Sequence, residues 1–99
     1  MIRVIAVLTA KPGQRQTLID IFRGNVEAVR AEAGCLEYQG VVDAEGPWAK
    51  HGPDALVVIE TWESAQALRA HAVSPHMVAF NEKTKEIIAA RAVYVLSPI

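Results

Sequence analysis

The segment from Ile2 to Thr9 carries apolar side chains on both of its alternating faces. Successive side chains of a strand point to opposite faces of a sheet, so this pattern predicts a strand that is covered on both sides. A chain of 99 residues has room for one hydrophobic core and one domain, residues 1–99. The sheet must therefore be covered on one face by this chain's own helices and on the other face by something else.

The rest of the chain alternates between helix and strand patterns. Apolar residues at three- and four-residue spacing predict an amphipathic helix from Gln14 to about Ala33, with Gly34 just past its end. Ser64 is placed to cap a short helix that ends near His71 or Ala72, and Ser74-Pro75 opens a longer helix through Ile88. Three more strands are predicted, the first with a bulge at Gly40: Cys35–Val42, Ala55–Trp62 and Arg91–Ser97.

The element order β-α-β-β-α-β predicts an α+β fold of the ferredoxin-like kind, with a four-stranded antiparallel sheet. Right-handed crossovers place all the helices on the same side of that sheet. The uncovered face would be an apolar patch too large for a monomer. We therefore expect a homodimer that forms face to face around a two-fold axis.

Charge and composition exclude several classes of partner. The formal net charge is −1 and the basic residues are dispersed, so we expect no nucleic acid partner. The apolar run from Val4 to Leu8 is too short for a signal peptide or a membrane span, which predicts a cytoplasmic protein that does not bind membranes. Cys35 is the single cysteine, and we interpret it as a packing residue.

Three stretches of the chain together resemble the antibiotic-biosynthesis-monooxygenase domain family. The first is Lys11-Pro12-Gly13, and the second is Ala33-Gly34-Cys35-Leu36-x-Tyr38. The third is Glu60-x-Trp62, followed by Ala65-x-x-Leu68-x-x-His71-x-x-Ser74-Pro75-His76-x-x-Ala79-Phe80. This resemblance implies a dimeric α/β barrel. It is less specific for a reaction, because similar proteins include quinol monooxygenases, polyketide-tailoring oxygenases, haem-degrading enzymes and signalling-molecule isomerases.

The haem-degrading branch fits this sequence poorly. That branch uses an asparagine in its first strand, whereas Ile2 to Thr9 has none, and His71 stands at the position that resembles its tryptophan. The resemblance therefore favours a monooxygenase that needs no cofactor and oxidises a quinol or another hydroxyaromatic with dioxygen. In such a reaction the substrate is the reductant, so the protein must bind the ring, exclude water and supply a base.

His71 is the first candidate for that base, since the ordinary pKa of histidine suits proton transfer near neutral pH. The alternative is a histidine that bonds a free carbonyl at a helix end. Glu60 lies among apolar strand positions and must have a partner, which is either His71 or a structural group such as the backbone or an arginine. His76, in the first turn of the next helix, is a second candidate, or else faces solvent.

Aromatic residues near the signature could form the walls of a substrate pocket. Trp62, Phe80 and Tyr38 are candidates, although the first two also suit the core and Tyr38 also suits a dimer interface. We expect no metal site, because the pair His71 and His76 crosses a helix break and lacks a third ligand.

Two other functions remain open at this point. One is a non-catalytic dimeric module that binds a small molecule. The other is an isomerase of a small phosphorylated signalling metabolite, which the absence of a basic cluster around the signature disfavours.

Overall fold

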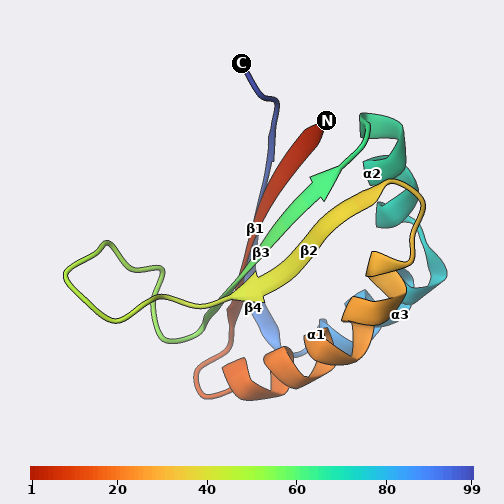
Figure 1. The fold of residues 1–99 in the computed structure, drawn as a ribbon. Helices are drawn as coiled ribbons and strands as arrows, with labels where there is room; N and C mark the ends of the chain where they lie inside the picture. The colour runs from red at the N-terminus through yellow and green to blue at the C-terminus, as the bar shows by residue number, and fades with distance from the viewer.

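The computed structural model describes residues 1–99 as four strands and three helices (Figure 1). Their order confirms the predicted ferredoxin-like α+β fold. The elements are β1 (Ile2–Ala10), α1 (Arg15–Arg30), β2 (Cys35–Val41), β3 (Ala55–Trp62), α2 (Ala65–Ala72), α3 (Pro75–Thr84) and β4 (Ile88–Leu96).

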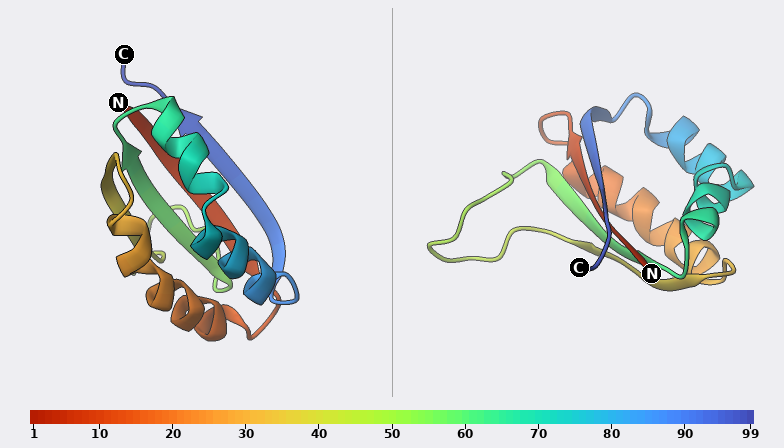
Figure 2. Two further views of the ribbon diagram at one scale, coloured as in Figure 1. Left: turned by 90° about the vertical axis from the view of Figure 1, so that its right-hand side faces the viewer. Right: turned by 90° about the horizontal axis from the view of Figure 1, so that it is seen from above.

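The four strands form one antiparallel sheet in the order β2-β3-β1-β4. Strand β1 therefore lies inside the sheet, between β3 and β4, and pairs with both along its length. All three helices lie on the same face of the sheet, and the opposite face is uncovered (Figure 2). This arrangement is the one that right-handed crossovers predict.

The hydrophobic core lies between the sheet and the helices. Alternate residues of β1 and β3 point into it, because successive strand residues face opposite sides. Helix α1 contributes one apolar stripe at helical spacing, formed by Leu18, Phe22 and Val29. The buried core consists of Val4, Ala6, Leu8, Ala10, Leu18, Phe22, Val29, Tyr38, Leu56, Val58, Trp62 and Phe80.

Two predicted helix ends need correction. Helix α1 stops at Arg30 rather than Ala33, and Gly34 follows with a positive φ of 83° that favours glycine. Helix α3 stops at Thr84 rather than Ile88, and the Thr84 hydroxyl donates to the Phe80 carbonyl at 2.8 Å. Strand β4 accordingly begins at Ile88, three residues before the predicted start, because Ile88 already pairs with β1.

The predicted bulge at Gly40 is also wrong. Gly40 pairs in register with Val58, and the irregularity of β2 lies between Cys35 and Glu37. The glycine is there for packing, because a Cβ atom at Gly40 would lie 2.7 Å from the Phe22 ring. The Phe22 ring can approach the backbone of β2 this closely only because residue 40 has no side chain.

The uncovered face of the sheet is apolar across its middle. The register aligns Ile59, Ile5 and Tyr94 in one row, and Val57, Val7 and Ala92 in the next. Tyr94 remains 55% exposed. We call these six residues the open face.

The connection between β2 and β3 projects beyond the sheet (Figure 1). Its base is closed by the Asp43 carboxylate, which accepts from the backbone N–H groups of His51 at 3.0 Å and Gly52 at 2.9 Å. Trp48 on this connection is 65% exposed. None of the three helices combines the length and apolar character that crossing a membrane requires.

Candidate active site

His71 lies in the last turn of α2, with its ring turned toward the sheet. Ser64 begins this helix by accepting a hydrogen bond from the backbone N–H of Ala67 at 3.1 Å, as predicted. The imidazole is only 4% exposed. Its centroid lies 4.6 Å from the Trp62 ring and 5.8 Å from the Tyr38 ring. These contacts hold the imidazole ring in one orientation, which determines where its two nitrogens point.

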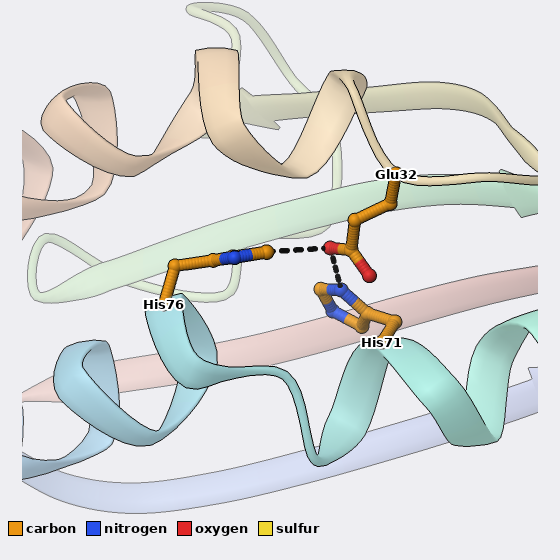
Figure 3. Close-up of side chains that lie close together, drawn as sticks. All are labelled: Glu32, His71 and His76. Atoms are coloured by element: carbon orange, nitrogen blue, oxygen red, sulfur yellow. Dashed lines mark hydrogen bonds and ion pairs between the residues drawn. The ribbon is translucent and has the colours of Figure 1, made fainter.

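The Glu32 carboxylate binds one of these nitrogens. Glu32 lies in the turn between α1 and β2, and its Oε2 atom is 2.7 Å from Nδ1 of His71. The same oxygen is 2.8 Å from Nε2 of His76, which stands in the first turn of α3 (Figure 3). One carboxylate oxygen therefore joins two histidines that belong to two different helices.

These contacts assign the proton positions on both rings. A carboxylate is an acceptor, so Nδ1 of His71 donates to Glu32, and in the neutral form of the ring Nε2 keeps the lone pair. Nε2 of His76 donates to Glu32 for the same reason. It also lies 3.2 Å from Ser74 Oγ, whose hydroxyl donates to the His71 carbonyl at 2.8 Å. The free acceptor of His71 is therefore Nε2, on the side of the ring away from Glu32.

Glu60, on β3, stands near that free acceptor. Its Oε1 atom is 3.9 Å from Nε2 of His71 and accepts a hydrogen bond from the Trp62 indole at 2.9 Å. Burial raises the pKa of Glu60 more than the indole hydrogen bond lowers it. The carboxylate that holds the His71 ring is therefore Glu32, and Glu60 makes its direct hydrogen bond to Trp62.

An apolar cavity of about 190 Å³ opens in front of His71, between the sheet and helices α2 and α3. His71 and Glu60 form a polar part of its wall, and Arg91 and Asn81 add polar groups that lie 3.5 Å apart. Burial raises the pKa of the Tyr38 hydroxyl, which therefore stays protonated. The apolar wall includes Val4, Ala6, Leu8, Val58, Leu68 and Phe80.

The structure brings four of the six predicted site residues to this cavity: Tyr38, Glu60, His71 and Phe80. Trp62 is fully buried behind His71 and does not line the cavity. His76 faces a second groove between α1 and α3, on the other side of Glu32. Trp62 therefore packs against His71, and His76 bonds to Glu32, but neither of the two lines the cavity.

Sequence reasoning missed Glu32. Its contact with His71 joins positions 39 residues apart, and no spacing rule connects a turn carboxylate to a helix in another part of the chain. The available signal was local, because Glu32 stands directly before the Ala33-Gly34 pair of the family signature. That placement fixes the turn from which the carboxylate reaches the site.

Glu32 also corrects the argument against a metal site. That argument depended on the lack of a third ligand beside His71 and His76, and the structure supplies a carboxylate at this position. One donor atom from each of the three residues lies within 4.8 Å of the other two.

A ferredoxin-like sheet whose helical face encloses an apolar cavity beside a carboxylate-held histidine defines a small α+β domain with a polar group at an apolar pocket. The sequence matches the family described as "Antibiotic biosynthesis monooxygenase" over residues 1–83. The chain belongs to this family.

The similarity to individual relatives covers nearly the whole chain. One is the protein named "Probable quinol monooxygenase YgiN" from Escherichia coli strain K12, with 37% identity over 99% of this chain and 98% of the relative. The structure of PA3566 from Pseudomonas aeruginosa is similar with a TM-score of 0.85 and 28% identity, over 99% of this chain and 93% of that one. The structure of Rv0793 from Mycobacterium tuberculosis has a TM-score of 0.83 and 30% identity, over 99% and 94%.

Proposed function

We propose that this protein is a monooxygenase that oxidises a quinol or a related hydroxyaromatic with dioxygen and without a cofactor. The observation that carries the proposal is His71, a residue of the cavity wall whose Nδ1 is held by Glu32 and whose Nε2 lies 3.9 Å from Glu60 in the same wall. Membership of the family and the name of the Escherichia coli relative support the same type of reaction.

In the proposed reaction Nε2 of His71 accepts the proton of a substrate hydroxyl. The resulting anion is electron-rich enough to reduce dioxygen, so the substrate supplies the electrons. The ring gains one oxygen atom and loses two hydrogen atoms, and the second oxygen atom leaves as water. Glu32 stabilises the imidazolium that forms, because its carboxylate already accepts the Nδ1 proton at 2.7 Å.

The cavity supports a small, flat substrate. Its volume of about 190 Å³ is below the roughly 300–1,000 Å³ that is usual for drug-sized ligands, and its wall is mostly apolar. A ring in this space would lie against Phe80 and Tyr38, with a hydroxyl directed to His71. Arg91 is the one cation of the wall, which leaves little provision for a phosphorylated substrate.

A binding module without catalysis is the alternative, because the same cavity could hold an aromatic ligand that does not react. Oxygen uptake by metal-free protein, measured with a panel of hydroquinones, distinguishes the two functions. We expect uptake and a hydroxylated quinone product with at least one compound. Shifts in melting temperature without oxygen uptake across the panel would replace the oxygenase with the binding module.

We further propose that the protein is a homodimer joined through the open face. The rows Ile59–Ile5–Tyr94 and Val57–Val7–Ala92 form a contiguous apolar surface. A second copy related by a two-fold axis would cover this surface with the same residues. The two sheets would then enclose a shared core, with the helices outside.

A further inference from the structure

We propose that Glu32, His71 and His76 form a binding site for Zn²⁺ behind the wall of the cavity. The ligand atoms are a Glu32 carboxylate oxygen, Nδ1 of His71 and Nε2 of His76, which all lie within 4.8 Å of one another (Figure 3). Two imidazoles and one carboxylate form a usual ligand set for zinc, with a water molecule in the fourth position.

The donor atoms must move to fit the ion. Zinc binds nitrogen at about 2.0–2.1 Å in a tetrahedron, which places neighbouring donor atoms roughly 3.3 Å apart. In the structure the two N···O distances are 2.7 and 2.8 Å, so the carboxylate must withdraw by roughly half an ångström. The two ligand nitrogens lie within 4.8 Å of each other, and the side chains of His71 and His76 must bring them to the same separation. Glu32 lies in a turn rather than in a helix or strand, which allows this movement.

The ring nitrogen of His71 that does not bind zinc also has a nearby partner, the Glu60 carboxyl. When Nδ1 of His71 binds the ion, its ring proton moves to Nε2, 3.9 Å from the Glu60 carboxyl. A histidine that binds zinc with one nitrogen and faces a carboxylate with the other is a common arrangement. Neither Glu32 nor Glu60 forms an ion pair with a lysine or arginine, so no fixed cation competes for their charge.

The position of the site favours zinc over a catalytic iron. An oxygenase iron must keep open positions that face the substrate. Here His71 contributes Nδ1, the nitrogen that faces Glu32, and neither Glu32 nor His76 belongs to the cavity wall. His76 instead lies at the groove between α1 and α3, with a side chain 26% exposed, and this groove gives the ion its path from solvent.

Zinc binding also affects His71 as the proposed base. This part of the inference rests on the proposed function. The lone pair of His71 Nε2 exists because Nδ1 carries the ring proton. A zinc ion on Nδ1 transfers that proton to Nε2 and leaves no acceptor for the substrate proton. Zinc therefore inhibits the oxygenase from behind the cavity without entering it.

Calorimetry on chelator-treated protein without a histidine tag tests the site. We expect one Zn²⁺ per chain, and a Co²⁺ complex with the visible absorption of a tetrahedral site. Glu32→Gln and His76→Ala should each weaken zinc binding by at least about tenfold. His51→Ala is the matched control, because His51 is exposed on the β2–β3 connection, and it should bind zinc as the parent does. Melting temperatures confirm that each variant is folded.

Two outcomes would overturn the site: no saturable binding of Zn²⁺ or Co²⁺, or binding that persists unchanged in Glu32→Gln and His76→Ala. The binding measurement needs no substrate, so it stands even if the protein oxidises no quinol. Where oxygen uptake is found, Zn²⁺ should abolish it and a chelator should restore it. Uptake that continues with zinc bound would contradict the inhibition.

Discussion

Glu32 Oε2 accepts a hydrogen bond from Nδ1 of His71 at 2.7 Å, across 39 residues of sequence. This contact fixes which nitrogen of the buried imidazole is free to accept a proton. It gives the proposed base an orienting carboxylate, in the way that a buried aspartate orients the histidine of a serine protease.

Replacing Glu32 with glutamine should therefore lower turnover while leaving substrate affinity nearly unchanged. Glutamine keeps the size of the side chain but removes its charge, and its amide can donate to Nδ1 and reverse the ring tautomer. We expect kcat to fall at least about tenfold, and by no more than the about 10²–10⁴-fold that a general base contributes. Steady-state kinetics with KM measured separately tests this, and an unchanged kcat would show that Glu32 does not orient the base.

Removing the proposed base, His71, should lower activity more. His71→Ala is expected to lower kcat/KM by about 10²–10⁴-fold, because the proton acceptor in the cavity wall is lost. His51→Ala, on the exposed connection, should retain full activity. Because His71 is buried, rates must be normalised to the folded fraction, measured by circular dichroism. Full turnover by folded His71→Ala would rule out the mechanism.

The open face predicts a substitution that would separate the proposed dimer. Ile59→Arg places a charge in the middle of the apolar rows, where a partner sheet would bury it without a counter-ion. Sedimentation should give a dimer for the parent protein and a folded monomer for this variant. Val78→Arg is the control, since Val78 is 59% exposed on α3, on the helical side. A parent protein that sediments as a monomer at micromolar concentration would remove the interface.

Alanine substitutions at Gly40 and Gly24 should change the free energy of unfolding in opposite directions. Gly40→Ala brings a Cβ atom to 2.7 Å from the buried Phe22 ring, and overpacking of this kind costs about 1–3 kcal/mol of unfolding free energy. Gly24→Ala adds a methyl group within α1 where nothing lies within 4 Å, and should stabilise by about 0.5–1 kcal/mol. Urea denaturation measures both, and equal effects would contradict the packing at Gly40.

The base of the β2–β3 connection should open in acid. Hydrogen bonds from the His51 and Gly52 amides lower the pKa of Asp43. A lowered pKa means that the carboxylate holds the connection above its unfolded pKa and releases it as pH falls through the lower, folded value. The amide resonances of His51 and Gly52 should therefore shift together, with one midpoint below the ordinary range for aspartate. Asp43→Asn should abolish this transition, and independent midpoints for the two amides would argue against a shared carboxylate.

The sequence predicted those parts of the fold that depend on local patterns. The bounds of β3 and the cap at Ser64 agree with the structure, because alternation and capping are set by neighbouring residues. The end of α3 was missed, since Ile88 leaves the helical pattern to pair with β1, far away in sequence. Glu32 was missed for the same reason, as its partners are set by how α1, α2 and α3 meet.

The strand order also has a consequence for how the chain is made. The ribosome releases β1 first, yet one of its two neighbours in the sheet is β4, which ends at Leu96. Until β4 emerges, one edge of β1 has no hydrogen-bonding partner, and such edges pair readily with other chains. The sheet can therefore close only after β4 has been made, and a chain shortened before residue 88 would expose the strand that its own fold places inside.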